Sequence, residues 1–318
     1  MGTNTIEFEQ LIEKGCGLDV HKETIVATVR GKGIKTETKT YSAFTSSLTE
    51  MKEWLKSMGI THIAMESTGV YWKPVFNILE DAFEILLVNA RHLKNVPGRK
   101  TDKADSRWIS KLLISGLLKG SFVPPENIRE LRDLSRYKTK LTGQIASEKN
   151  RIQRILEDAN IKLSSVVSDT SGVVATKLID GLMAGRKDLD KLVEESYHGK
   201  LSASREELKE ALTGRVTDHH VFMLKQMKSH IAYLEGQIEL IDREMDNKLA
   251  EYNEQLELLQ TIPGVGRDGA KGILSEIGTN MDVFPDENHL SSWAGICPGN
   301  NESAGKKKVQ GHGTGTNI

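Results

Sequence analysis

Four acidic residues are spaced as in a site that binds two divalent metal ions, and a serine lies far downstream of them. Asp19 and Glu66 each end an apolar run, and Asp102 and Asp105 stand three residues apart. Ser303 lies in a stretch rich in glycine and lysine. Mg²⁺ prefers hard oxygen ligands, and two such ions about 4 Å apart can activate a nucleophile and stabilise the leaving oxygen of a phosphodiester. The pattern therefore predicts cutting and rejoining of DNA.

Each of these residues also has an ordinary interpretation. An Asp or Glu at the end of a strand is commonly a solvated turn residue, and Asp102 at the start of a helix is a good N-cap. A serine among glycines, such as Ser303, is commonly a turn residue as well. The four acids favour a metal site as a set, because they follow one another in a single order of elements.

The first third of the chain has the pattern of an α/β domain. Alternating apolar residues between turn residues predict strands at 15–20, 24–29, 34–41, 60–65 and 84–88. Helical spacing of apolar residues predicts helices at 44–58, 70–79 and 102–118. Three antiparallel strands followed by alternating helices and strands is the element order of the ribonuclease H-like fold. With the first and fourth strands adjacent, Asp19 and Glu66 would lie side by side.

The rest of the chain is predicted to be mostly helical. Residues 128–159 form one long helix in this interpretation, and 169–199 a more broken region. From Met227 to Leu259 apolar residues recur in a heptad pattern. This seam is either a long helix packed on its own domain or a coiled coil used for dimerisation. The glycine-rich tail is predicted to be loop.

The segment Gly264–Gly269 formally matches the GxGxxG pattern of dinucleotide-binding proteins. That interpretation needs a preceding strand, whereas a long helix and Pro263 come first. A helix-hairpin-helix fits better, with the amides of Gly264 and Gly266 available to a DNA phosphate. A purely structural helical hairpin is the remaining alternative.

Basic residues surround the second pair of acids and recur along the predicted long helix. They are either solvated faces or contacts to phosphates. The first group is Arg91, Lys94, Arg99, Lys100, Lys103, Arg107 and Lys111, and the second is Arg129, Arg132, Arg136, Lys138, Lys140, Lys149, Arg151 and Arg154. Lys306 and Lys307 follow Ser303 and are further candidates for phosphate contacts.

The composition is that of a globular protein without an overall basic character. Among 318 residues, 38% are hydrophobic and 27% charged, and the formal net charge is -1, so any phosphate-binding surface must be local. The two cysteines, Cys16 and Cys297, form no metal or disulfide motif. No apolar stretch approaches the roughly 20 residues that cross a bilayer, and we expect a soluble, cytoplasmic protein.

Taken together, these motifs resemble the DEDD transposases of insertion sequences, the IS110 family, which are related to the Piv-type DNA invertases. The resemblance runs from about Gly15 to Lys308. It is carried by Gly17–Lys22, Met65–Tyr71, Asn89–Arg91, Lys100–Asp105, Ile262–Gly266, Ala294–Pro298 and Asn301–Lys306.

The resemblance implies a RuvC-like nuclease domain, a helical coiled-coil linker and a C-terminal transposase domain. We place them at 12–125, 126–255 and 256–318. It also implies that Asp19, Glu66, Asp102 and Asp105 bind two Mg²⁺ ions, and that Ser303 is a nucleophile that forms a phosphoserine link to DNA. Such a link stores the phosphodiester energy for rejoining. The implied partners are the DNA of the element and its target, a structured guide RNA, and further copies of the chain in a homodimer or tetramer.

The sequence departs from the family pattern after Ser303. Family members continue with a basic stretch and further helices, whereas this chain continues as Val309–Ile318. We therefore expect a truncated C-terminal domain, and an inactive nucleic-acid-binding remnant is the main alternative to an active transposase. A RuvC-like nuclease without transposition and an actin-like sugar kinase are lesser alternatives. The kinase interpretation lacks support, because it needs a phosphate loop rich in Gly, Ser and Thr, and His21–Glu23 contains none of these.

Overall fold

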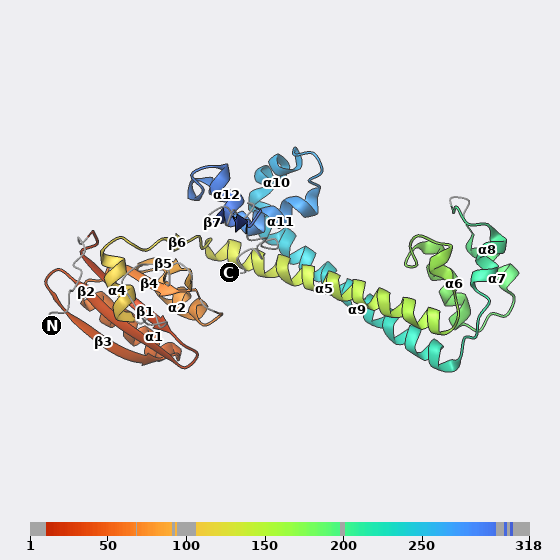
Figure 1. Ribbon diagram of the computed structural model, residues 1–318, viewed down its shortest axis with the longest axis horizontal. Helices are drawn as coiled ribbons and strands as arrows, with labels where there is room; N and C mark the ends of the chain where they lie inside the picture. Colours follow the sequence, from red (N-terminus) through yellow and green to blue (C-terminus); the bar gives the residue numbers. More distant parts are fainter. Residues whose placement is uncertain are drawn as a thin grey trace. The chain divides into compact units, whose positions relative to one another are not determined.

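The protein is described by a computed structural model that comprises two compact units. The structure describes residues 11–67, 69–90, 93, 106–197, 201–296, 302–303 and 306–307. The first unit, which we call the sheet unit, contains Met1–Val123 and Asp282–Ile318. The second, the helical unit, contains Pro124–Met281. Figure 1 shows the elements of each.

A six-stranded sheet forms the centre of the sheet unit. Its strands are β1 (Lys14–Val20), β2 (Thr24–Gly31), β3 (Ile34–Ser42), β4 (His62–Glu66), β5 (Glu84–Val88) and β6 (Gly120–Ser121). The strand order is β3-β2-β1-β4-β5-β6. β1, β4 and β5 are parallel to one another, and the outer strands pair antiparallel to their neighbours. The five predicted strands are confirmed. β6 was missed because two residues are too few to show alternation.

Helices pack on both faces of this sheet. The first face carries α1 (Thr45–Ser57) and α2 (Trp72–Leu79), and the second carries α4 (Ser106–Ile114). Side chains of a strand alternate between faces, so Cys16 and Leu18 of β1 lie in the core beneath α1 and α2. Gly15 and Gly17 lie on the opposite face of β1, toward α4, whose apolar side chains form a separate cluster with Ala64 and Val88.

Helix α4 ends four residues earlier than its apolar pattern predicts. Gly116 adopts a positive φ of 64°, which glycine reaches without strain. The amide of Leu117 then donates to the carbonyl of Leu112 at 3.1 Å, as in a glycine-terminated helix. The prediction of helix up to Leu118 was therefore wrong, since the glycine stops the helix although apolar residues continue.

The helical unit is built on two long antiparallel helices with smaller helices at each end (Figure 1). Its elements are α5 (Glu126–Asp158), α6 (Val173–Met183), α7 (Leu189–Ser196), α8 (Arg205–Ala211), α9 (Asp218–Leu249), α10 (Asn253–Gln260) and α11 (Arg267–Ile277). Near the start of α5, Glu130 binds Lys248 at 2.8 Å, and further along Glu148 binds His230 at 3.1 Å. These two pairs establish the antiparallel register of α5 and α9.

The heptad seam of α9 is buried within the same chain. Leu234, Ile241, Met245 and Leu249 form a core with apolar residues of α5. Met227 belongs to a second core, shared with α6, α7 and α8. The seam thus pairs α9 with α5, and its interpretation as a surface for dimerisation was wrong. A heptad repeat indicates that one face of a helix is buried, but it does not identify the helix that covers this face.

The tail contains structure that its glycine content concealed. Helix α12 (Glu287–Trp293) begins at an Asp286 side chain that accepts from the amide of His289, and β7 (Glu302–Ser303) pairs with β8 (Lys306–Lys307). α12 precedes the glycine-rich tail and agrees with the mostly helical C-terminal part that was predicted, whereas the prediction of loop was wrong for β7 and β8. The rings of Phe122, Phe284 and Trp293 pack together with centroids 5.4–6.1 Å apart.

The compact units divide the chain at other points than the three predicted domains. Helices α10 and α11 share a core with α5 and α9, so residues 256–281 belong to the helical unit. The segment from Asp282 belongs to the sheet unit instead. The three-part division remains a prediction.

Candidate active site

Asp19 and Glu66 occupy corresponding positions on neighbouring parallel strands. Leu18 of β1 and Met65 of β4 are register partners, and the two acids are the next residue on each strand. Adjacent strands lie about 4.8 Å apart, and both acids share the pleat face of Gly17 and Ala64. This confirms the predicted adjacency of β1 and β4. The two carboxyl-bearing positions thus meet at the carboxyl ends of their strands, on the face that carries α4.

The surroundings of these acids suit a cation. The Asp19 side chain is 27% exposed, and its Oδ2 lies 3.3 Å from Nε2 of His21. Glu66 is half-buried, and the neighbouring amide of Ser67 donates to the carbonyl of Val88. Carboxylate oxygens are hard ligands of the kind that Mg²⁺ prefers. Partial exposure of both side chains leaves them accessible to an ion from solvent. The donor chemistry therefore fits the expected metal.

The first turn of α4 lies directly against β1. A Cβ atom built on Gly17 would stand 2.3 Å from both the carbonyl oxygen of Ser106 and the amide nitrogen of Ser110. A Cβ on Gly15 would stand 2.8 Å from Leu113. The start of α4 therefore lies over the half of β1 that ends at Asp19, and only glycine permits so close an approach.

A chain of hydroxyl groups, buried at Thr28 and Ser106 and half-buried at Thr38, joins this first turn to the sheet. The Oγ1 of Thr28 is 2.7 Å from the Oγ of Ser106 and 2.9 Å from the Oγ1 of Thr38. The Nε of Arg107 donates to the same Thr38 hydroxyl at 3.3 Å. Thr28 and Ser106 are 0% and 1% exposed. Our sequence interpretation missed these residues, although small residues at strand spacing (Gly15, Gly17) and at helix spacing (Ser106, Ser110) were a signal for close packing.

The second pair of acids falls outside the described part of the chain. This applies to Asp102 and Asp105, and also to Arg99, Lys100 and Lys103. Among the residues that are described, no three His, Cys, Asp or Glu side chains gather into a metal-binding group. The four-carboxylate site therefore remains a prediction, of which the structure describes two members.

Ser303 is placed by its backbone. It lies in β7 and is the register partner of Lys306 in β8, while Glu302 partners Lys307. Lys306 follows Ser303 by three residues in the sequence. The hairpin brings the two residues opposite each other on neighbouring strands.

Gly264 and Gly266 form the turn between α10 and α11, as predicted for a helical hairpin. Gly264 has a φ of 87°, and the amide of Val265 donates to the carbonyl of Ile262 at 3.0 Å. A side chain on either glycine would meet nothing within 4 Å. The turn is therefore open at both glycines, and its contact with a DNA phosphate stays a prediction.

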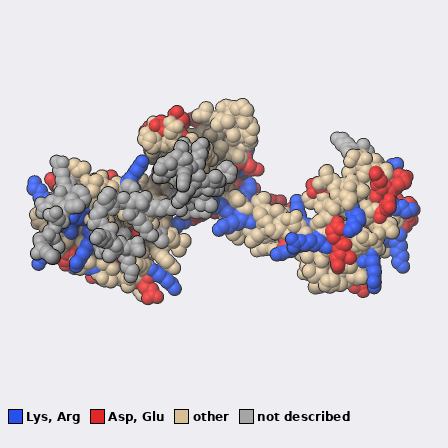
Figure 2. All heavy atoms as spheres, in the orientation of Figure 1, with Lys and Arg blue, Asp and Glu red and all other residues tan. Residues whose placement is uncertain are grey.

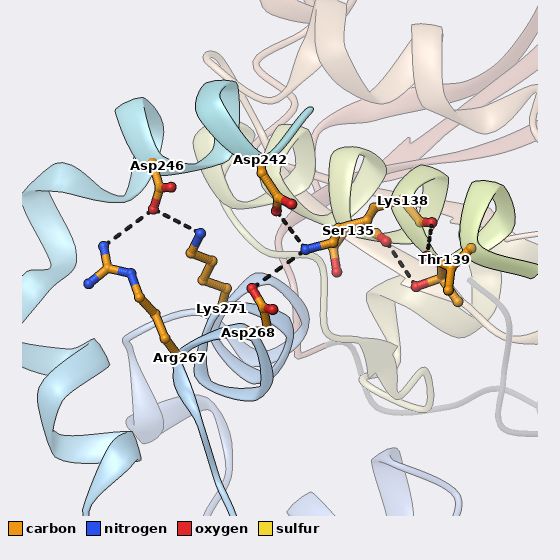
Figure 3. Close-up of polar contacts among 9 residues, drawn as sticks. Ser135, Lys138, Thr139, Asp242, Asp246, Arg267, Asp268 and Lys271 are labelled. Carbon is orange, nitrogen blue, oxygen red and sulfur yellow. Dashed lines mark hydrogen bonds and ion pairs between the residues drawn. The ribbon is translucent and has the colours of Figure 1, made fainter. Parts of the chain in front are cut away.

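Charged pairs hold this hairpin against the long helices (Figure 3). Asp246 of α9 accepts from Lys271 at 2.8 Å and lies 3.3 Å from Arg267, both on α11. Lys138 of α5 lies 2.6 Å from Asp242 and 3.5 Å from Asp268. These pairs position the turn, and the cations at the start of α11 are already neutralised within the unit.

These contacts shift the pKa values of the groups involved. The hydrogen bond from Lys271, followed by that from Arg267, lowers the pKa of Asp246 against the opposing effect of burial. Burial is the largest single influence on Lys138 and would lower its pKa. The hydrogen bond to Asp242 and the charges of Asp242 and Asp268 together outweigh it, so that the pKa is raised. Both shifts favour the charged forms and hence the docked hairpin.

The basic run along α5 serves mostly internal pairing. Arg136 makes two hydrogen bonds with the Glu276 carboxylate, at 2.8 and 2.9 Å, and Arg132 is paired with the same residue. Arg151 binds Glu148 at 2.6 Å, and Lys138 is paired as described above. Figure 2 shows Lys and Arg interleaved with Asp and Glu over the visible face. Several cations of the run are thus paired with acids of the same unit, and contact of α5 with a nucleic-acid backbone stays a prediction.

Comparison with known proteins agrees with the resemblance seen in the motifs. A family model described as transposase, that of the DEDD transposases of IS110 elements, matches residues 16–161. A second, described as transposase IS116/IS110/IS902 family, matches residues 256–315. The two matches together cover about two thirds of the chain.

A curated relative gives the same indication over a shorter stretch. The transposase for insertion sequence element IS1328 from Yersinia enterocolitica is 32% identical over 91 residues, which are 29% of this chain and 27% of that protein. None of the helices in the described ranges has the length and apolar character that a bilayer crossing requires. On the strength of the two family matches, the chain belongs to the IS110 family of insertion-sequence transposases.

Proposed function

We propose that this chain is a DNA transposase whose sheet unit is a ribonuclease H-like, RuvC-like nuclease domain. The observation that carries the proposal is the placement of Asp19 and Glu66 at the carboxyl ends of the adjacent parallel strands β1 and β4. The strand order, with three antiparallel strands followed by two parallel ones, supports the fold. Family membership supports the reaction, which is cutting and rejoining of DNA.

In this proposal Asp19, Glu66, Asp102 and Asp105 hold two Mg²⁺ ions. When bound, the ions supply charge stabilisation on the phosphate that is cut. The protein's part is to bring the acids together. Ser106 lies against Gly17, which is two residues before Asp19, and Ser106 directly follows Asp105 in the sequence. Because Asp105 directly precedes Ser106 in the sequence, we place the second acid pair of the proposed site at the same end of the sheet as Asp19 and Glu66.

Ser303 is the proposed nucleophile for strand transfer. Attack of its hydroxyl oxygen on a phosphodiester forms a phosphoserine bond and releases a DNA hydroxyl, which takes up the proton lost by the serine. Attack by a second DNA hydroxyl reverses these changes and restores the serine. The register pairing of Ser303 with Lys306 places a cationic residue on the neighbouring strand.

Contacts to phosphates are proposed at three places. Arg99, Lys100, Lys103 and Arg107 flank the second acid pair, and Arg107 is exposed at the start of α4. The turn of Gly264 and Gly266 supplies backbone amides in the helical unit, and Lys306 and Lys307 lie beside Ser303. Phosphate contacts of this kind position DNA without reading its sequence. From the family resemblance we add a structured RNA of the element and a homodimeric or tetrameric assembly.

The proposal is tested with the full chain, DNA carrying the element ends, RNA transcribed from the element, and Mg²⁺. Asp19→Asn and Glu66→Gln should each abolish excision, and Ser303→Ala should abolish a labelled protein–DNA adduct that survives denaturing electrophoresis. Glu84→Gln is the matched control, because this β5 carboxylate is 71% exposed and binds His62 at 3.0 Å away from the site. Full excision by Asp19→Asn, or an adduct formed by Ser303→Ala, would refute the mechanism.

A further inference from the structure

Two aromatic side chains of the sheet unit stand out in solvent. Phe44 is 78% exposed and Tyr71 is 43% exposed, and Val70 beside Tyr71 is exposed as well. Among the Phe, Tyr and Trp residues of the sheet unit that the structure describes, these two are the exposed ones. Burial of an aromatic ring is strongly favourable, so two rings left in water at one place call for a reason outside the packing of the fold.

The topology places both rings at the edge of the sheet where the strands β1, β3 and β4 end. These strands share one direction, since β1 and β4 pair parallel and β2 is antiparallel to both β1 and β3. Phe44 directly precedes α1, which follows β3, and Tyr71 directly precedes α2, which follows β4. The amide of Ala43 donates to the carbonyl of Glu23 at 3.0 Å, which ties the start of α1 to the turn after β1.

The same edge carries the two described acids of the proposed site. Asp19 is the penultimate residue of β1, and Glu66 is the last residue of β4. In the strand order β3-β2-β1-β4, Phe44 follows the first of these four strands and Tyr71 follows the last. A nucleic-acid strand that crosses this edge therefore passes both rings and both acids.

Helix stability does not explain an aromatic residue at either position. Phe44 and Tyr71 are the N-cap residues of α1 and α2, and neither side chain makes a capping hydrogen bond. Ser, Thr, Asp and Asn are the residues that stabilise a helix at this position. What a ring offers in solvent is a flat apolar face, on which a nucleobase of any sequence can stack.

We propose that Phe44 and Tyr71 stack on unpaired bases of the DNA strand that is cut, and so position its phosphodiester at Asp19 and Glu66. Bases inside a duplex are stacked on one another and present no free face, whereas bases released during strand exchange do. The inference rests on the function proposed above. It adds two residues that touch the DNA bases and neither the metal ions nor the phosphate.

The test measures binding of an oligothymidylate that carries one 2-aminopurine to the full chain without metal. Phe44→Ala and Tyr71→Ala should each bind about tenfold more weakly, which corresponds to about 1.4 kcal/mol and lies within the range for one stacked base. Both should also quench the 2-aminopurine fluorescence less than the wild type does. Circular dichroism checks that the variants are folded.

Three further variants separate stacking from other effects. Phe44→Leu keeps an apolar side chain without a ring and should bind as weakly as Phe44→Ala, whereas Tyr71→Phe keeps the ring and should bind as the wild type does. Leu117→Ala is the matched control. Leu117 is 40% exposed and follows α4, whose Leu113 lies against Gly15 near the beginning of β1, so it stands at the opposite end of the sheet.

Several results would overturn the inference. Wild-type binding and quenching by Phe44→Leu would show that a ring is not required, and an equal loss of binding to a blunt duplex would show that free base faces are not. If only an oligouridylate is bound more weakly by Phe44→Ala and Tyr71→Ala, the edge holds RNA and the assignment to DNA is wrong. If these variants change the sedimentation of the chain but not strand binding, a second copy covers the rings instead.

The excision assay distinguishes failure of this inference from failure of the proposed function. If Asp19→Asn abolishes excision while Phe44→Ala and Tyr71→Ala bind the strand and excise as Leu117→Ala does, the stacking role is wrong and the acidic site stands. If Asp19→Asn excises fully, the proposed function is wrong, and the role of the two rings at the cut falls with it.

Discussion

Replacement of Gly17 by alanine is the sharpest test of how α4 sits on the sheet. The new Cβ would stand 2.3 Å from the carbonyl oxygen of Ser106 and the amide nitrogen of Ser110, whereas ordinary contact begins at 3.4 Å. Both neighbours are backbone atoms of one helix, so no side chain can rotate away. The helix must retreat by about 1 Å, the difference between these contact distances.

The magnitude follows from two opposing effects. Overpacking of a core costs about 1–3 kcal/mol, while replacing a strand glycine by alanine ordinarily gains about 0.5–1 kcal/mol of backbone entropy. Because the clash involves backbone at two points, we expect the upper range of the cost and a net loss of about 2 kcal/mol. A displacement of about 1 Å near a reacting centre can cost about 100-fold in rate, and we expect a decrease of this order in excision.

Urea unfolding followed by tryptophan fluorescence measures this loss. All four tryptophans of the chain belong to the sheet unit, so the signal reports on that unit: Trp54, Trp72, Trp108 and Trp293. Gly143→Ala in α5 is the matched control, because its Cβ meets nothing within 4 Å. This variant should gain up to about 1 kcal/mol in the helical unit, as seen by circular dichroism. A Gly17→Ala protein with wild-type stability and excision would show that α4 does not lie against β1.

Three further predictions concern the helical unit. Glu276→Ala leaves the buried Arg132 without its carboxylate and should lower the free energy of unfolding by about 1–3 kcal/mol, measured by urea unfolding with circular dichroism. The lowered pKa of Asp246 means that its contribution is complete above the unfolded value near 3.8 and is lost as pH falls through the lower folded value. The protection of α11 amides against hydrogen exchange, taken relative to the intrinsic rate at each pH, should therefore fall below about pH 4 in the wild type, and constant protection would contradict this. Leu234→Ala should lower the free energy of unfolding by about 2–5 kcal/mol, because Leu234 is only 3% exposed. Tyr233→Ala beside it, at 62% exposure, should change this free energy by less than about 0.5 kcal/mol. Equal effects of the two substitutions would refute the assignment of the buried seam.

Local patterns were sufficient to predict strands β1 to β5, helices α1 and α2, and the location of two site residues. Strand alternation identified β1 to β5, and the ends of β1 and β4 located Asp19 and Glu66. These predictions succeeded because a side chain's face on a strand depends only on the parity of its position. Element order, too, is a property of the chain itself, and it indicated β1 and β4 as neighbours.

Partners of the long helices were decided by tertiary structure. The heptad seam of α9 predicted a buried stripe, but the chain's own α5 buries it. The basic run of α5 contained no sign of its internal partners, and the structure pairs Arg136 with Glu276 and Lys138 with Asp242. Periodicity and charge describe one helix at a time. The residue that covers a face or pairs with a charge comes from a distant part of the chain.

The packing of α4 against β1 shows most clearly which features the sequence determines and which depend on tertiary structure. The sequence by itself contained the small residues Gly17, Ser106 and Ser110 and the acids next to them. Only the folded chain shows that Thr28 bonds Ser106 at 2.7 Å and that Gly17 admits the helix backbone. Such contacts join positions 78 residues apart, and they depend on how two independently formed elements fit together in space.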